Sequence, residues 1–106
     1  MKELLCNAIA KRNLLSFTYD DFLRVVEPHL CGQNGAGHDI LAAWLVGGYS
    51  KSDPKPGWRT YLLSEMRNVQ VLDATFQRPR PSFNSRDARI ARTYCMLEVP
   101  PPVSQD

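Results

Sequence analysis

The sequence has no long hydrophobic run and no large excess of charge of either sign. No apolar segment in it approaches the roughly 18 residues that a membrane-spanning helix needs. Thirteen lysines and arginines stand against eleven acids, and the formal net charge of +2 is too small to indicate a partner by itself. The first residues do not resemble a signal peptide, so we expect a cytoplasmic protein that does not contact a membrane.

The composition excludes general disorder, because hydrophobic residues make up 43% of the chain and charged residues 23%. A chain of 106 residues is long enough for one folded domain, which we expect over 1–99. All six glycines lie between Gly32 and Gly57, whereas five of the eight prolines follow residue 78. This distribution predicts turns in the middle of the domain and a disordered, proline-rich tail over 100–106.

The sequence is poor in cysteine, with three residues: Cys6, Cys31 and Cys95. The odd number and the absence of a Cys-x-x-Cys pair argue against a disulfide framework and against a zinc knuckle. We therefore expect reduced thiols that are mostly buried and pack as small hydrophobic groups.

A recognisable catalytic or metal-binding constellation is also missing. No serine stands in a Gly-x-Ser-x-Gly context, and the one pair of adjacent carboxylates, Asp20 and Asp21, falls in a predicted turn. The spacing of His29 and His38 relative to their nearest acid and thiol matches no known metal site. We expect no enzymatic activity, no metal and no cofactor.

Hydrophobic periodicity predicts one helix and several short strands. Apolar residues recur at helical spacing over 2–11, and alternation such as Leu15, Phe17 and Tyr19 on one face indicates strands. The predicted strands cover the ranges 14–19, 22–27, 58–63, 69–72 and 93–99. The predicted non-regular segments are a turn at 20–21, loops at 32–37 and 50–57, a turn at 64–67 and an irregular basic stretch at 77–89.

Pro28 and the run at 39–46 interrupt this alternation. Pro28 lacks a backbone donor and is expected to end the second strand. Residues 39–46 form an apolar run that fits a buried helix and a buried strand equally well. The whole predicts a mainly β (α+β) protein, a small bent antiparallel sheet or barrel with a helix at one end.

The order of residues in the middle of the chain resembles the WYL domain family. The likeness covers about 14–75 and is most specific at Arg24-Val25-Val26-Glu27-Pro28 and from Arg59 to Val69. The eponymous Trp-Tyr-Leu tripeptide is absent, and we expect no helix-turn-helix domain before the segment. The resemblance implies an Sm-like, SH3-type β-barrel over 14–75, with 39–46 as a strand, a basic arm at 77–92 and a return strand at 93–99. It implies a bacterial or phage protein, without enzymatic activity, that senses a ligand in transcription regulation.

Two arginines on predicted strands are the first candidates for a binding site. Arg24 and Arg59 have apolar or uncharged neighbours, so we expect packed stems and exposed guanidinium groups that together grip a carboxylate or phosphate. The alternative is a pair of salt bridges to Glu27 or Glu65. Tyr61 shares a strand face with Arg59 and is the best candidate for stacking on a base.

Two further residues complete the predicted cleft. His29 follows Pro28 and either hydrogen-bonds in a turn or lines the cleft as a donor that protonation can switch. Arg67, the last residue of the predicted turn, adds a third cation to the same ligand site. For the family, the resemblance implies that arginines at the positions of Arg24 and Arg59 line the ligand cleft.

The basic arm carries five arginines between Arg78 and Arg92 but one acid, Asp87. Arginine beside aromatic residues suits a phosphate backbone with stacked bases, so the arm is a candidate nucleic-acid contact. The residues proposed for that contact are Arg78, Arg80, Phe83 and Arg86. The alternative is a solvated arm that wraps the barrel and pairs with acids elsewhere in the chain: Asp20, Asp21 and Asp73.

Two functions remain open from the sequence. The first is a non-catalytic module that binds a nucleotide, another phosphate-bearing ligand or single-stranded nucleic acid. The second is a structural or interaction protein that self-associates or binds a partner protein through exposed strand edges, with the run 40–46 and the strand around Val69 and Val71 as its candidate surfaces.

Overall fold

The computed structural model describes residues 1–48 and 55–98, and the chain there is mainly β. The elements are α1 (Lys2–Lys11), β1 (Asn13–Tyr19), β2 (Phe22–Asn34), β3 (Asp39–Gly48), β4 (Gly57–Leu62), the 3₁₀ helix η1 (Leu63–Glu65), β5 (Arg67–Thr75) and β6 (Ile90–Met96). The predicted tail at 100–106 and most of the predicted loop at 50–57 lie outside the described residues. In the described part, no helix is long and apolar enough to cross a membrane.

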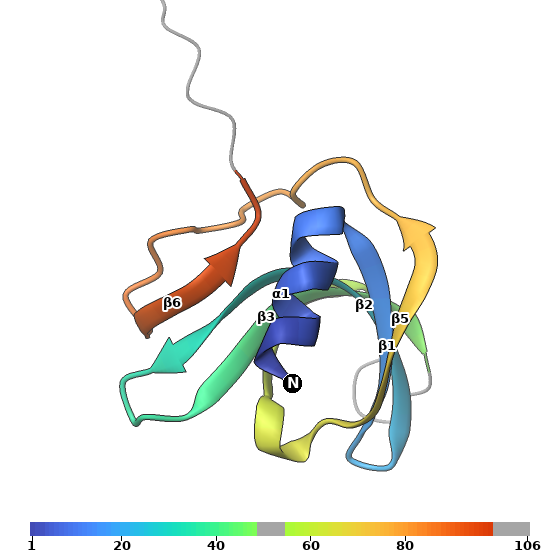
Figure 1. Cartoon of the computed structure of the whole chain (residues 1–106), viewed down its shortest axis with the longest axis horizontal. Coiled ribbons are helices and arrows are strands. Elements are labelled where there is room, and N and C mark those ends of the chain that lie inside the picture. Colours follow the sequence, from blue (N-terminus) through green and yellow to red (C-terminus); the bar gives the residue numbers. More distant parts are fainter. Residues whose placement is uncertain (49–54, 99–106) are drawn as a thin grey trace, which may run out of the picture.

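The strands form one six-stranded antiparallel sheet in the order β4-β3-β2-β1-β5, with β6 paired to β2 off this path. The long strand β2 is the centre, because its first half pairs with β1 and its second half with β6 (Figure 1). Within the described residues, hydrogen bonds do not join β4 to β5, so they do not close the sheet into a barrel. The predicted mainly β fold with an N-terminal helix is confirmed.

The second strand does not end at Pro28, as the sequence predicted, but runs to Asn34. The register with β3 shifts between Pro28 and Leu30, and a proline without a donor is tolerated at such an irregularity. The turn between β2 and β3 is stabilised by the Asn34 side-chain oxygen. This oxygen accepts hydrogen bonds from the backbone N–H groups of Ala36 and His38, at 3.1 and 2.9 Å.

The ambiguous run at 39–46 is a strand, as the family resemblance implied, and it extends to Gly48. It lies between β2 and β4, so its backbone groups have partners on both sides. Residues 77–89 contain no helix or strand, as predicted, and the return strand begins earlier than expected, at Ile90.

Helix α1 covers the sheet with one apolar stripe, formed by Leu5, Ala8 and Ile9. These side chains join a buried cluster with Leu15 and Phe17 of β1. The helix lies across the sheet beside β6 (Figure 1). A ten-residue helix is marginal in isolation, so this packing is what stabilises it.

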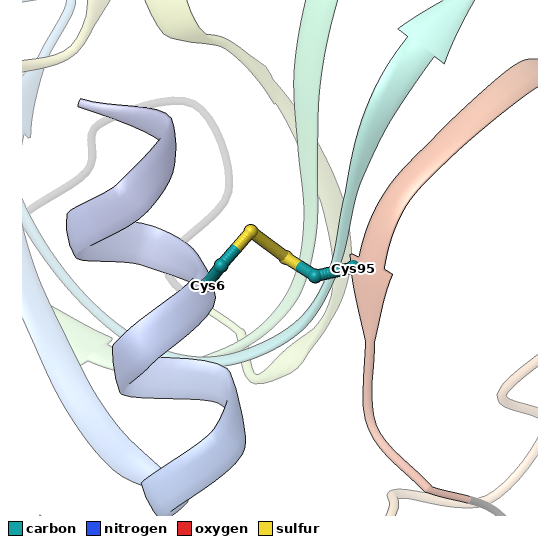
Figure 2. Close-up of a disulfide and its surroundings, with 2 residues drawn as sticks. All are labelled: Cys6 and Cys95. Atoms are coloured by element: carbon teal, nitrogen blue, oxygen red, sulfur yellow. A yellow bond between two sulfur atoms is a disulfide. The ribbon is translucent and has the colours of Figure 1, made fainter.

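A disulfide joins Cys6 of α1 to Cys95 of β6, with the two Cα atoms 5.7 Å apart (Figure 2). The expectation of three reduced thiols is therefore wrong for two of them. The two partners are 89 residues apart in sequence, and only the packing of α1 against β6 brings them together. Cys31 is a buried free cysteine, and burial raises the pKa of its thiol to about 11.

Candidate functional site

Arg24 points into the protein and not into solvent, so the expectation of an exposed guanidinium is wrong. Arg24 lies opposite Phe17 in the β1–β2 ladder, and directly opposed residues of antiparallel strands share a face. Phe17 belongs to the core, and Arg24 is accordingly only 7% exposed. Its Nη2 donates to the Tyr19 carbonyl at 3.2 Å, whereas its Nε has no hydrogen-bond partner among the described residues.

Tyr61 of β4 is buried on the same inner face, with 3% of its surface exposed. Its ring meets Phe17 and Tyr19 edge to face, each at a centroid distance of 4.9 Å. A base therefore finds no exposed ring face to stack on. The Tyr61 hydroxyl is buried and lacks a hydrogen-bond partner in the described part of the chain.

The charges of Arg24 and Arg59 both act on the Tyr61 hydroxyl. Burial raises the pKa of Tyr61, and the positive charges of these two arginines oppose that shift. The backbone places them accordingly, because Arg59 precedes Tyr61 by two residues on β4 and Arg24 lies opposite Phe17, whose ring contacts Tyr61. We call the three residues Arg24, Arg59 and Tyr61 the inner site.

Arg59 is half-buried and its guanidinium is held by the backbone at the start of β4. It donates to the carbonyls of Trp58 and Lys55, at 2.8 and 2.9 Å. Arg67 is different, because it is exposed at the first position of β5, opposite Thr18 of β1. The inner site therefore contains two of the three predicted cations.

Tyr19 and Glu65 lie next to the inner site. The Tyr19 hydroxyl donates to the Glu65 carboxylate at 3.0 Å and accepts from the Leu62 backbone N–H at 3.1 Å. Burial, more than any other effect, raises the pKa of Tyr19. Glu65, one of the two acids expected to pair with a strand arginine, binds this tyrosine.

The other expected partner, Glu27, binds the basic arm. Its buried carboxylate accepts two hydrogen bonds from Arg80, from Nε at 2.6 Å and from Nη2 at 2.9 Å. The Arg80 guanidinium also lies over the Trp44 ring, 5.2 Å from its centroid. A glutamate among the apolar residues of a strand was the available sequence signal for this anchor, but not for its partner.

His29 is fully buried in β2 and receives the arm from the same side. Its Nε2 accepts the Arg80 backbone N–H at 3.0 Å, and so its Nδ1 carries the proton and donates to the Glu27 carbonyl at 2.8 Å. Burial lowers the pKa of His29, which favours this neutral form. The predicted hydrogen bonding is present, on a strand and not in a turn.

Aromatic contacts complete the docking of the arm. Trp58 donates its indole N–H to the Pro81 carbonyl at 2.9 Å. Phe83 stacks on Trp58 at 5.9 Å and meets the His29 ring at 5.2 Å. Of the four predicted nucleic-acid contacts, Arg80 and Phe83 thus face the protein itself.

The remaining two predicted contacts of the arm, Arg78 and Arg86, are exposed. The structure matches the alternative in which the arm wraps the sheet, but the acids differ from those expected. Glu27 is the anchor, and Arg89 forms a local pair with Asp87 at 2.6 Å. The expected acids on other segments, Asp20, Asp21 and Asp73, form no ion pair among the described residues.

A cleft of about 710 Å³ lies between the arm and the outer surface of the sheet. Its apolar wall includes Ile40, Trp58 and Phe83, and its polar rim includes Asn34 and Asn84. Such a combination suits a small organic ligand. Across residues 1–48 and 55–98, no three His, Cys, Asp or Glu side chains gather as they would around a metal ion.

No family model, curated protein or solved structure matches this chain. The resemblance to the WYL domain family therefore stays a prediction.

Proposed function

We propose that this protein is a non-catalytic module that binds a phosphate-bearing ligand at the inner site. The observation that carries the proposal is the pair of buried polar atoms, Arg24 Nε and Tyr61 Oη, that lack partners among the described residues. Both groups can donate a hydrogen bond, and one is a cation. A ligand with clustered, negatively charged oxygens satisfies both.

The energetics favour such a ligand. A buried donor without a partner costs about 1–3 kcal/mol, which a bound acceptor recovers. The guanidinium of Arg24 matches the oxygens of phosphate, and the nearby charge of Arg59 adds attraction in surroundings with little water. Aromatic rings surround Tyr61. The inner site therefore selects its ligand through the charges of its two arginines and the hydrogen bonds that Arg24 Nε and the Tyr61 hydroxyl donate.

The ligand class we propose is a nucleotide or a short single-stranded nucleic acid. The exposed Arg78 and Arg86 are available for contact with a phosphate backbone. Arg80 and Phe83 contribute by holding the arm in place. We further propose an Sm-like, SH3-type fold and a role in transcription regulation in a bacterium or phage.

From the sequence alone, we also propose that the protein is cytoplasmic. The disulfide between Cys6 and Cys95 favours an oxidising compartment instead. Treatment of acid-quenched cells with a thiol-alkylating reagent distinguishes the cytoplasm from an oxidising compartment. Alkylation of all three cysteines supports the cytoplasm, and alkylation of Cys31 alone contradicts it.

The decisive variant is Tyr61→Phe, because it removes only the unpaired hydroxyl. We expect unchanged or higher thermal stability, together with at least about tenfold weaker binding of AMP or short single-stranded DNA. Tyr94→Phe is the matched control, since the Tyr94 hydroxyl already donates to Asp39 at 2.7 Å. We expect Tyr94→Phe to lower the stability and to leave the affinity for AMP and single-stranded DNA unchanged.

Titration calorimetry with inorganic phosphate, AMP and short single-stranded DNA separates the ligand classes. Affinity for DNA should fall as salt rises from about 50 to about 200 mM. Arg24→Lys keeps the charge, loses the Nε donor and weakens binding of all accepted ligands. Absence of binding at low salt, or affinity that Tyr61→Phe leaves intact, contradicts the proposal.

The second candidate, an interaction protein, is favoured by one observation. Strand β5 ends the hydrogen-bonded path of the sheet, and none of its residues is buried. Such an edge is open to another strand. Tests of ligand binding and of association use different residues, so the two functions can be judged separately.

A further inference from the structure

Strand β5 is an edge strand of the sheet. It pairs with β1 along one side and ends the path β4-β3-β2-β1-β5. All nine of its residues are exposed or half-buried, including Val69, Val71 and Leu72. Proteins commonly protect such edges with proline, lysine or inward-pointing charges. The stretch from Val69 to Leu72 has none of these.

Apolar side chains gather beside this edge. A groove of about 470 Å³ between α1 and β5 is lined by Met1, Leu4 and Val71. These are three of the six large hydrophobic side chains that are exposed in the described ranges, and Val71 is 44% exposed. The groove also has opposite charges from α1, Glu3 and Lys11. Exposed apolar surface next to an open edge indicates a place of contact with another chain.

We propose that β5 pairs antiparallel with β5 of a second copy of this chain, around a two-fold axis at Gln70. This register places Val69 of each copy opposite Val71 of the other. It also places Asp73 of each copy at the start of the other copy's strand, beside Arg67. The pairing is isologous, because both copies contribute the same residues.

The sequence of β5 selects this register over its neighbours. With the axis moved to Val71, Val69 would face Asp73 of the second copy, an apolar residue against an acid. With the axis at Val69, Arg67 would face Val71. Only the axis at Gln70 pairs valine with valine and arginine with aspartate at once, and both kinds of pair stabilise antiparallel strands.

Asn68 limits the regular pairing at the beginning of the strand. Its φ of 57° is left-handed, and the register with β1 shifts there. A second register shift lies between Val71 and Thr75, so the central ladder covers Val69 to Val71, and Arg67 and Asp73 meet through their side chains outside it. A two-fold axis perpendicular to the sheet keeps both α1 helices on one face, where the grooves adjoin.

The association is weak because the paired segment is short. We expect an interface at the small end of specific interfaces and a dimer that forms between about 1 μM and about 1 mM protein. Sedimentation equilibrium should show the mass rise from 12.0 kDa toward twice that value with concentration.

A charge exchange tests the register. Arg67→Asp alone and Asp73→Arg alone each bring like charges together across the two-fold axis, and we expect at least about tenfold weaker dimerisation. The double variant, Arg67→Asp with Asp73→Arg, restores an opposite pair and should recover the wild-type constant. All substituted positions are exposed, and circular dichroism verifies that each variant is folded.

A pair of matched lysine substitutions tests the surface. Val71→Lys should abolish dimerisation, whereas Val46→Lys, at a 37% exposed valine of β3, should leave it intact. A monomer at every concentration overturns the proposal. So does a larger ring, which would indicate β4–β5 pairing between copies, or a double charge variant that stays as weak as the single ones.

Discussion

Glu27 and Arg80 are joined by two hydrogen bonds of 2.6 and 2.9 Å across 53 residues of sequence. The carboxylate is buried in the central strand and the guanidinium belongs to the arm. Together with the bonds from His29 and Trp58, this contact fixes where the arm crosses the sheet, although the arm has no regular secondary structure.

Arg80→Ala should destabilise the protein by about 2 kcal/mol, because it leaves the Glu27 carboxylate buried without its charged donor. Urea unfolding monitored by tryptophan fluorescence measures the change. Arg89→Ala is the matched control, since Arg89 pairs with Asp87 at the surface and we expect a clearly smaller loss of stability. Equal losses in the two variants would contradict the role of Glu27 as an anchor.

Stability should fall as the solution is acidified below the ordinary pKa of histidine, 6.5. Burial lowers the pKa of His29 in the folded state, so the unfolded chain binds the proton more readily and gains population as the pH falls toward the folded value. Protonation of Nε2 also removes the acceptor of the Arg80 N–H. Unfolding free energies between pH 7 and pH 5 measure the effect.

His29→Gln provides the comparison for this pH dependence. The variant is less stable at neutral pH, because the ring contacts with Phe76 and Phe83 are lost. Its stability should change less between pH 7 and pH 5 than that of the wild type. The same slope in both proteins would assign the effect to another group.

Reduction of the disulfide should lower the free energy of unfolding by about 4 kcal/mol, since the cross-link between Cys6 and Cys95 closes a long loop. The Cys6→Ser, Cys95→Ser double variant should be as stable as the reduced wild type, and dithiothreitol should not change its stability. Cys31→Ala should still respond to dithiothreitol. Thermal unfolding with and without the reductant compares the three proteins, and an identical wild-type midpoint in both buffers would refute the expectation.

Gly32→Ala should disturb the junction of β2 and β6. A Cβ atom at Gly32 would lie 2.5 Å from the carbonyl oxygen of Arg92, so the backbone of β6 has to move. We expect a loss of about 2 kcal/mol in urea unfolding. Gly47→Ala is the control, because no described atom lies within 4 Å of its added Cβ. A control that is destabilised as much as Gly32→Ala would show that space is not the cause.

The local pattern of the sequence was sufficient for α1 and for most strands. The apolar stripe of Leu5, Ala8 and Ile9 and the alternation of Leu15 and Phe17 report periodicity directly, and both sets are buried. Pattern alone could not decide the run at 39–46, because both faces of the strand carry apolar residues: Leu41, Ala43 and Leu45 on the buried face, and Ala42, Trp44 and Val46 on the other.

The site was harder to predict because its geometry depends on contacts that are distant in sequence. Arg24 and Arg59 were recognised as candidates, but the inward direction of Arg24 depends on which face of β2 packs with Phe17. The contact of Glu27 with Arg80 and the bond of Cys6 with Cys95 depend on tertiary packing that no local spacing encodes.

The covalent link between the first helix and the last strand has a consequence for cleavage of the chain. Because Cys6 and Cys95 enclose nearly the whole domain, a protease that cuts one peptide bond between them leaves two fragments tied to each other. The nicked protein migrates as one species on a denaturing gel without reductant and as two with it. Damage to the backbone of an oxidised molecule therefore does not release its pieces.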